Sequence, residues 1–479
     1  MRSVVFRFTR DLRLEDHAGL AEAARHGAIL PVLIVDPLLQ ARVGRSPRRA
    51  AFFVRAVAAL DAALREQGSA LIVRRGRLKE ALLALVDELR PGAVVWSASY
   101  DAVAMAEESD VRAALEERGV IAPIVHDAPA VPPEETAAAK LGRGEGYRAL
   151  GPYIEAWRAI NVLSHEAPLF RRFAKPEIQS EPLPGNRDFK LAPSAEEAVP
   201  AAAQQMLASF LRQDALQYDV AVNVPADDRT SHLAAHLSFG TIAARTVVRE
   251  TQRRSEDPFL LAEERASLRR FLRSLAQRDF FLQLAWFQPE SQREPLQPKM
   301  REFQFQGSHA HLEDWKQGKT GFTLVDAGIR QLHATGWMHP HARAIAASFL
   351  CFDLEVHWRV GLEEWDRYLI EDEPALAAGN WQWIAGVGAD LAAYPRIYNP
   401  VKGARRFDPE GNYARAWIAE LAHGLAAFNT QSQPALPLFG RDGYPSPILD
   451  HDAAARRFLA RYNAFVNAVT RADAPRSNR

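Results

Sequence analysis

The 479-residue sequence has very little cysteine, because Cys351 is its only one. A single thiol excludes an internal disulfide and also a four-cysteine iron–sulfur cluster. No histidine, cysteine or acidic residues follow one another with the spacing of zinc ligands, so no bound metal is expected. We therefore expect Cys351 to be an ordinary core residue.

Long apolar segments are absent as well. No run of about eighteen apolar residues occurs, so no segment is expected to cross a membrane. The first residues, Ser3-Val4-Val5-Phe6, have the pattern of a strand and not that of a signal peptide. These two absences predict a cytoplasmic protein without a membrane partner.

An excess of charge of either sign is also missing, since 59 lysines and arginines balance 59 aspartates and glutamates. Many nucleic-acid-binding domains are strongly basic, so DNA binding here requires a local patch. Short basic clusters that fit this requirement are Arg253–Arg254, Arg269–Arg270, Arg396, Lys402 and Arg405–Arg406. Clusters of this size are equally typical of an ordinary solvated surface.

Residues 1–127 alternate short apolar runs with amphipathic stretches, such as residues 48–67. This alternation predicts an α/β domain with a doubly wound parallel sheet and helices on both faces. The strands are expected at residues 4–8, 29–35, 70–73, 93–97 and 121–126. The motif GxGxxG is missing after the first strand, so the usual dinucleotide fingerprint of such sheets is absent.

The pattern changes twice after this domain. Residues 128–200 are interrupted by prolines, and a connector of this length is rare inside one compact domain. Residues 201–471 are helical and aromatic, without strand alternation, and predict one large all-α domain. The polar residues 472–479 are expected to form a disordered tail.

The densest pattern lies at residues 335–400. A helix is expected from Pro340, followed by a second, shorter helix and the acidic turn Glu371-Asp372-Glu373. The expected apolar faces consist of Ile345, Phe349, Phe352 and Val356 in the first helix and Leu362, Trp365 and Leu369 in the second. The glycine of the following run, Gly-Asn-Trp-Gln-Trp at residues 379–383, is expected to allow close backbone approach. By pattern alone, the simplest interpretation is a packed helix pair with a surface turn.

Several motifs in this half of the chain resemble the FAD-binding half of the cryptochrome/photolyase family. They read Gly336-Trp337-Met338-His339, Trp358-Arg359, Trp381-Gln382-Trp383, Arg396-Ile397-Tyr398-Asn399-Pro400 and Phe407-Asp408-Pro409-Glu410-Gly411. Residues 6–16 and 151–157 are similar to the family's N-terminal motif and to its connecting segment. The order and spacing agree, so the sequence is identified as a member of this family. The resemblance implies an all-α, FAD-binding domain after the α/β domain.

The resemblance implies FAD as the cofactor. Thr230, Ser231, His232, Leu233 and Ala234 match the family's phosphate-binding Thr-Ser-Arg-Leu-Ser, and their pattern predicts the start of a helix. The changes to His232 and Ala234 remove phosphate donors. The other positions that match flavin contacts are Tyr218, Arg278, Arg343, Glu371, Asp372, Glu373 and Ala377.

Two of these positions carry specific expectations. Arg343 is expected to pair with Glu371, because an isolated buried charge costs several kcal/mol. Ala377 stands where family members carry asparagine or aspartate beside flavin N5, and alanine offers neither a donor nor a proton there.

The resemblance also implies light-driven electron transfer along three tryptophans. Trp381 matches the proximal position and Trp358 the middle one, but the distal position holds Phe305. Phenylalanine is much harder to oxidise than tryptophan or tyrosine. The usual route is therefore cut at its surface end, unless another tyrosine or tryptophan serves.

Four positions match the family's pocket for the DNA lesion. Trp383 keeps its tryptophan, whereas Ser274, Gln277 and His341 replace a glutamate, a tryptophan and an arginine. A flipped base needs a stacking wall and polar contacts, which these residues can supply in part.

These features predict a flavin-dependent DNA photolyase, a monomer that acts on UV-damaged DNA. The alternative is a cryptochrome-type blue-light photoreceptor with a protein signalling partner, and a third class is a binding protein with a vestigial pocket. A second, antenna chromophore stays open between a deazaflavin, a flavin and none, because residues 100–108 lack the Asn-Glu that binds folate in some members.

Overall fold

The structure is a computed structural model that describes residues 3–138, 145–164, 173–192, 198–307, 309–389, 395–422 and 443–472. Its contacts divide the chain into two compact units, each described by itself below. Unit 1 comprises Met1–Asp219, Thr230–Gln292 and Asp366–Leu376, and unit 2 comprises Val220–Arg229, Arg293–Trp365 and Ala377–Arg479. The predicted domain limits at residues 127 and 200 stay a prediction, and the expected tail lies beyond residue 472, outside the described residues.

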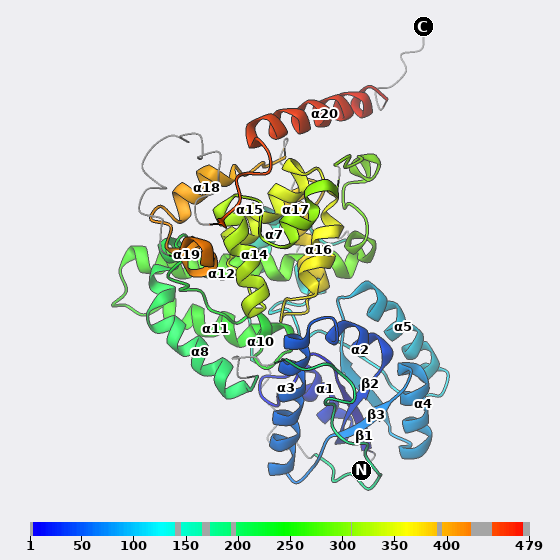
Figure 1. Ribbon diagram of the computed structural model, residues 1–479. Coiled ribbons are helices and arrows are strands. Elements are labelled where there is room, and N and C mark those ends of the chain that lie inside the picture. The colour runs from blue at the N-terminus through cyan, green and yellow to red at the C-terminus, as the bar shows by residue number, and fades with distance from the viewer. Residues whose placement is uncertain are drawn as a thin grey trace. The chain divides into compact units, whose positions relative to one another are not determined.

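Unit 1 contains a five-stranded sheet in which every pair of neighbouring strands is parallel (Figure 1). The strands are β1 (Ser3–Phe8), β2 (Ala28–Val35), β3 (Ile72–Arg75), β4 (Ala93–Ser97) and β5 (Ile124–Val125). Their order is β3-β2-β1-β4-β5, which reverses direction between β1 and β4. The predicted doubly wound parallel sheet is confirmed, although β3 and β5 begin later than expected.

Five helices accompany the sheet. They are α1 (Ala18–His26), α2 (Pro37–Val43), α3 (Pro47–Glu66), α4 (Leu78–Leu89) and α5 (Ala102–Glu116). Asp36 and Ser46 cap α2 and α3 with their side chains, and a proline follows each cap at the first helical position. These local signals explain why α3 matches the amphipathic stretch predicted at residues 48–67.

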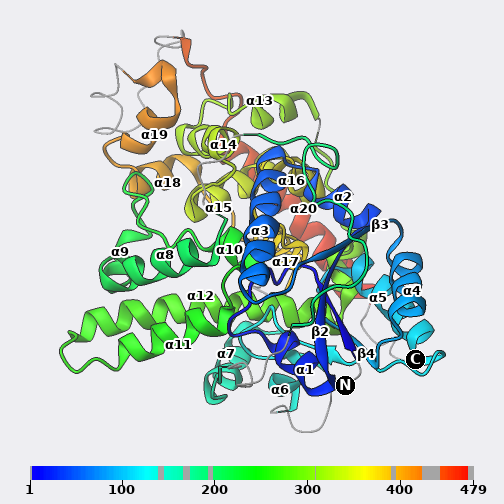
Figure 2. The same ribbon diagram turned by 90° about the horizontal axis from the view of Figure 1, so that it is seen from below.

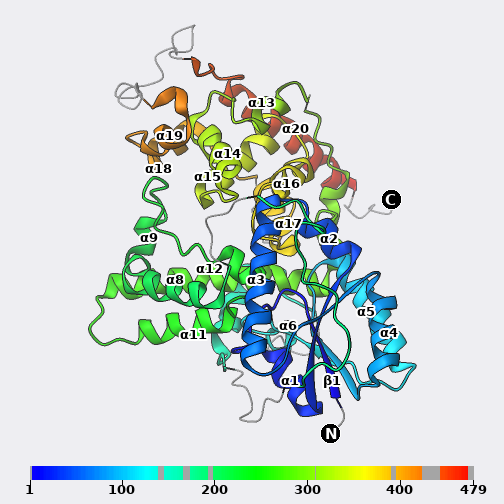
Figure 3. The ribbon, with the colours of Figure 1, turned by 60° about the horizontal axis from the view of Figure 1, so that its bottom comes forward.

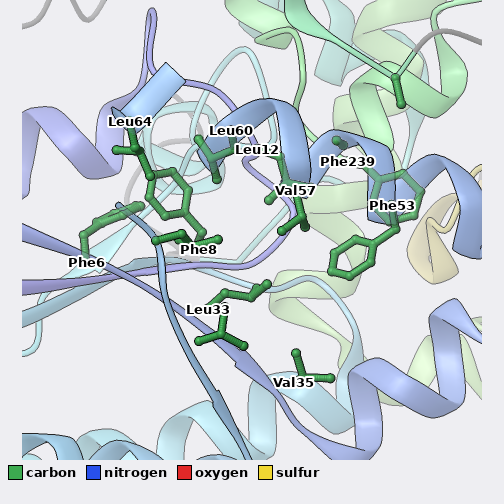
Figure 4. Close-up of a cluster of buried hydrophobic side chains, with 14 of the residues drawn as sticks. Phe6, Phe8, Leu12, Leu33, Val35, Phe53, Val57, Leu60, Leu64 and Phe239 are labelled. Carbon is green, nitrogen blue, oxygen red and sulfur yellow. The ribbon is translucent and has the colours of Figure 1, made fainter. Parts of the chain in front are cut away.

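Alternate residues of the strands point to opposite faces of the sheet. Phe6 and Phe8 of β1 pack in one cluster with side chains of α3, and Figure 4 shows both rings beside Leu60 and Leu64. Val5, between them, belongs to a second cluster with side chains of α4 and α5. Both faces of the sheet are therefore buried under helices.

The remaining helical elements of unit 1 follow the sheet in the chain. They are α6 (Pro133–Ala138), α7 (Leu150–Ala159), α8 (Pro200–Arg212), η1 (Asp214–Gln217), α10 (Ala234–Ser238), α11 (Ala244–Ser255), α12 (Ala262–Phe287) and η2 (Pro289–Gln292), and α9 (Tyr218–Ala221) crosses into unit 2. Helices α11 and α12 pack side by side (Figure 2). The predicted connector thus holds the two short helices α6 and α7.

Unit 2 is helical throughout its described residues. Its elements are η3 (Pro298–Glu302), η4 (His309–His311), α13 (Leu312–Lys316), α14 (Thr323–Thr335), α15 (Pro340–Ser348), η5 (Phe349–Asp353), α16 (Trp358–Asp366), α17 (Pro374–Ala385), α18 (Pro400–Phe407), α19 (Asn412–Trp417), η6 (Ala419–Leu421) and α20 (His451–Ala472). The last residue of α16 and the first three residues of α17 belong to unit 1. Helix α14 packs against α15, α18 and α19 (Figure 3). Across the described ranges, no helix is long and apolar enough to cross a membrane.

Two expectations about the helices at residues 335–400 need correction. Helix α15 begins at Pro340 as predicted, but it passes after Ser348 into a π-helical turn, η5, and Val356 lies beyond both. A π turn shifts the apolar face, so an α-helical period no longer applies there. Helix α16 likewise ends at Asp366, before Leu369. Cys351 is buried within η5, as predicted.

The close backbone approach expected at Gly379 stays a prediction. The run at residues 379–383 forms part of α17. A close contact does occur at Gly361 of α16, where an added Cβ would lie 2.2 Å from Cη2 of Trp381. A side chain at position 361 would displace the Trp381 indole.

Buried His236 predicts a pH-dependent stability. Its side chain is 1% exposed, and Nδ1 lies 2.7 Å from the Thr241 hydroxyl. Burial lowers the pKa of His236 to about 4. The unfolded state therefore takes up a proton below pH ~6.5 that the folded state resists, and stability falls as the pH drops from there toward 4, by about 3 kcal/mol in all.

Urea unfolding at a series of pH values measures this loss. His236→Gln should flatten the part of the profile between pH 6.5 and 4. Equal slopes in the wild type and His236→Gln would contradict the assignment.

Candidate functional site

The acidic turn at residues 371–373 is anchored by arginines of the same unit. The carboxylate of Asp372 lies 2.9 Å from Arg10 and 3.6 Å from Arg49, and also contacts Arg42. Arg42 in turn donates to Asp101 at 2.6 Å. Burial alone would raise the pKa of Asp372, but the three guanidinium charges outweigh it and hold that pKa far below its usual range. The contacts give Asp372 an anchoring role, and its contact with flavin stays a prediction.

The two flanking glutamates have different partners. Glu373 lies 3.3 Å from a guanidinium nitrogen of Arg278, and this arginine also donates to the Ala128 carbonyl at 2.8 Å. Burial raises the pKa of Glu373 and outweighs the opposing charge of Arg278. The backbone carbonyl of Glu371 accepts from Arg49 at 3.0 Å. The structure thus brings together two of the predicted flavin residues, Arg278 and Glu373.

A pocket lies where β1 and β4 end. Its polar lining includes Arg10, Asp11, Ser97, Tyr100, Ser238 and Glu373. Open α/β sheets bind ligands at the carboxyl ends of strands where the strand order reverses. This pocket occupies that position in the sheet of unit 1.

A cluster of acidic and imidazole groups borders this pocket. Ligand atoms of Asp11, His17 and Asp127 lie within 4.8 Å of one another. Arg13 and Arg245 each contact the Asp127 carboxylate at 2.7 Å, so its negative charge is already balanced by cations. The geometry favours a structural ion-pair network over a metal centre, and the absence of a bound metal stays a prediction.

The segment at residues 230–234, which is expected to bind phosphate, is only partly helical. Helix α10 begins only at Ala234, is five residues long, and has no side-chain cap from Leu233. His232 has a φ of 51°, a left-handed backbone that interrupts a helical run. The predicted helix thus begins at the last residue of the segment, with Thr230 and Ser231 just before it, and their contact with phosphate stays a prediction.

Tyr218 and Ser274 lie next to each other in unit 1. Burial raises the pKa of Tyr218, and a hydrogen bond with Ser274 opposes this. The Tyr218 ring also packs edge-to-face on Phe271, with centroids 5.4 Å apart. Ser274 is exposed and Gln277, one turn further along α12, is half-buried. Ser274 and Gln277 are thus at least partly accessible on one stretch of α12.

In unit 2, Arg343 lies on α15 as predicted, and its Nε donates to the Met338 carbonyl at 2.7 Å. Arg343 and Glu371 belong to different units, so their expected pairing stays a prediction. Ala377 is half-buried on α17.

The predicted DNA-contacting residues of unit 2 form two aromatic groups. The Arg396 guanidinium lies 5.9 Å from the ring centroid of Trp383, which is half-buried. His341 stacks on Phe407 with centroids 4.0 Å apart and an angle of 13°. Its Nε2 also lies 3.0 Å from the side-chain oxygen of Asn223. His341 is thus held in place, a role for Asn223 that the sequence did not reveal.

The predicted basic clusters differ in how they are paired. Arg253 and Arg254 form ion pairs with Glu250 and Asp257 of their own segment. Lys402, Arg405 and Arg406 are exposed on the short helix α18. Of these two clusters, α18 better fits a surface for an anionic polymer.

The expected electron carriers have unequal surroundings. Trp381 is 4% exposed, and its centroid lies 4.5 Å from that of Trp365, a residue that the sequence analysis assigned only to packing. Trp358 is fully buried beside His357, at 5.4 Å. The sequence did contain one signal that Trp365 lies near the expected electron carriers. Trp358 and Trp365 are seven residues apart, a spacing that places them on one face of a helix.

The comparisons with known proteins agree with this arrangement. The family model described as DNA photolyase matches residues 4–172, and the one described as FAD binding domain of DNA photolyase matches residues 271–464. The chain is 32% identical to the deoxyribodipyrimidine photo-lyase of Halobacterium salinarum, over 96% of this chain and 98% of that protein.

Solved structures show the same similarity. A class III photolyase from Agrobacterium tumefaciens superimposes with a TM-score of 0.84 at 27% identity, covering 98% of both chains. An archaeal photolyase from Sulfolobus tokodaii, solved with two FAD molecules, gives a TM-score of 0.80 at 26% identity and covers 96% of this chain and all of that one. The fold and the motifs define a protein with an α/β domain built on a parallel sheet, followed by a helical FAD-binding domain. The chain belongs to the cryptochrome/photolyase family.

Proposed function

We propose that this protein is a flavin-dependent, blue-light-driven DNA photolyase that repairs pyrimidine dimers by electron transfer from reduced FAD. The observation that carries the proposal is the similarity, along nearly the whole chain, to proteins named deoxyribodipyrimidine photo-lyase. UV-damaged DNA is then the partner. The monomeric state and the cytoplasmic location stay predictions from the sequence.

The residues present fit a flavin dinucleotide. A flavin needs balanced charge near its rings and an aromatic wall, and the buried Arg278–Glu373 pair and the Trp381 indole have these chemical properties. Bound FAD supplies the absorption of blue light and the transferable electron, neither of which protein side chains provide. Ala377 offers no hydrogen bond, so no side chain at that position stabilises a protonated flavin nitrogen.

The DNA lesion is expected to meet Trp383. Its half-buried indole gives a flat stacking surface, and the nearby Arg396 adds a cation for the phosphate backbone. Exposed Lys402, Arg405 and Arg406 on α18 extend the positive charge. A second, antenna chromophore has a precedent in the two FAD molecules of the Sulfolobus relative. The pocket at the ends of β1 and β4 has a volume of about 40 Å³ and is too small to hold such a chromophore in this conformation.

Illumination of the chemically reduced protein with damaged DNA tests the function. The substrates are cyclobutane dimers and (6-4) products, each in single-stranded and double-stranded DNA. We expect restoration of bases in at least one substrate. Trp383→Ala should lower substrate affinity about tenfold to a hundredfold, because base stacking on an aromatic ring is worth about 1–3 kcal/mol.

A matched control is Trp417→Phe, at a tryptophan on α19 outside the proposed pocket, which should leave repair unchanged. No repair of all four substrates by protein with fully reduced flavin would refute the photolyase and favour the blue-light photoreceptor.

A further inference from the structure

Helix α16 presents one face to Trp381. Trp358, Gly361 and Trp365 follow one another at spacings of three and four residues, so they share this face. An added Cβ on Gly361 would lie 2.2 Å from Cη2 of Trp381, so the tip of this indole rests on the glycine. The Trp381 indole therefore contacts α16 at Gly361, between Trp358 and Trp365 along the helix.

Starting from Trp381 and moving toward Trp365, each indole packs directly against the next one. The Trp381 and Trp365 centroids are 4.5 Å apart, and those of Trp365 and Trp315 are 6.0 Å apart with nearly parallel rings, at 16°. The exposed fractions of the three side chains are 4%, 6% and 0%. All three residues lie within unit 2. We call them the Trp381–Trp365–Trp315 row.

In the direction of Trp358, the rings that follow belong to His357 and Phe305, and neither is readily oxidised to a radical cation. His357 stacks on Trp358 at 5.4 Å, and Phe305 meets His357 edge-on at 5.3 Å. Burial lowers the pKa of His357, which keeps its ring neutral at ordinary pH. Neither a neutral imidazole nor a phenyl ring is oxidised as readily as indole, so this direction ends after two tryptophans.

We propose that the Trp381–Trp365–Trp315 row is the main path by which electrons reach the light-excited flavin, with Trp365 and Trp315 as carriers. This inference rests on the proposed function, because it needs the flavin as the electron acceptor. One electron leaves Trp381 for the oxidised flavin. Trp365 then reduces the Trp381 radical cation, and Trp315 reduces that of Trp365.

An external thiolate finally reduces Trp315 and becomes a thiyl radical, two of which combine to a disulfide. No tryptophan needs to lose a proton, because the Trp315 N–H donates to the Ala346 carbonyl at 3.0 Å, and a carbonyl is too weak a base to remove it.

Thiol-dependent photoreduction of the flavin-loaded protein, without DNA, tests the path. Trp365→Phe and Trp315→Phe should each slow photoreduction about tenfold or more, which corresponds to a barrier higher by about 1.4 kcal/mol. Trp358→Phe should cost less than either, and Trp417→Phe, outside the row, should cost nothing. Transient absorption should show a shorter-lived tryptophan radical in Trp315→Phe.

Two further measurements separate this path from a loss of folding. In the flavin-free protein, circular dichroism should show coupled indole bands that Trp365→Phe removes and Trp417→Phe keeps. Adding Phe305→Trp to Trp365→Phe should restore photoreduction by extending the Trp358 side.

The inference is overturned if Trp365→Phe photoreduces at the wild-type rate, or if Trp358→Phe alone abolishes photoreduction. A wild-type protein that takes up no flavin overturns the inference and the proposed function together. Normal photoreduction through the row without DNA repair refutes only the photolyase.

Discussion

Replacing Asp372 with alanine is expected to lower the free energy of unfolding by about 3–5 kcal/mol, the usual cost of removing one partner from a buried ion pair. The carboxylate is 3% exposed, and Arg10, Arg42 and Arg49 contact it from the N-terminal part of unit 1. Alanine would leave three guanidinium charges around an empty volume. Urea unfolding followed by tryptophan fluorescence measures the loss.

The matched control is Asp110→Ala, which breaks the exposed Lys79–Asp110 pair. Exposed pairs contribute less than about 1 kcal/mol, so this variant should unfold close to the wild type. Similar losses in the two variants would mean that the Asp372 cluster adds nothing beyond a surface pair.

The same carboxylate also predicts acid sensitivity. Its pKa in the folded state is held below the unfolded value of about 3.9, so its contribution is complete above that pH and is lost as the pH falls toward the folded value. Asp372→Asn should therefore be less stable than the wild type at pH 7 and should lose less stability on acidification. A profile of wild-type steepness in Asp372→Asn would assign the acid sensitivity to other carboxylates.

The sheet could be predicted from the sequence because its strands are buried on both faces. Continuous apolar runs mark β1, β2 and β4 within one residue of their observed ends. Strand β5 has only two residues and an exposed Ile124, so no periodicity can define it. The π turn after α15 was not predictable either, because buried apolar residues fill it as they would fill an α-helix.

The candidate functional site could be predicted from the sequence only in part, for a different physical reason. Family motifs pointed to Arg278 and Glu373, which the structure pairs. The partners of Asp372 lie more than 300 residues away in the chain, and only the tertiary fold brings such charges together. Trp365 was assigned to packing because an aromatic residue at helical spacing has the same pattern whether it fills a core or carries an electron.

Trp381→Phe is expected to abolish nearly all thiol-dependent photoreduction while leaving the FAD content unchanged. Trp381 rests on Gly361 between the levels of Trp358 and Trp365, so both directions along α16 begin at this indole. Phenylalanine removes the oxidisable ring but keeps an aromatic side chain against the glycine. We expect a rate at least about tenfold lower, equivalent to a barrier increase of about 1.4 kcal/mol.

The double variant Trp358→Phe/Trp365→Phe is the sharpest comparison for Trp381→Phe. If Trp381 is the branch point, closing both branches should slow photoreduction as much as removing Trp381 itself, whereas either single variant should keep part of the rate. Flavin absorbance under anaerobic blue light, with the FAD content checked after denaturation, measures each rate. A Trp381→Phe protein that photoreduces like the wild type would show that electrons enter the flavin without passing α16.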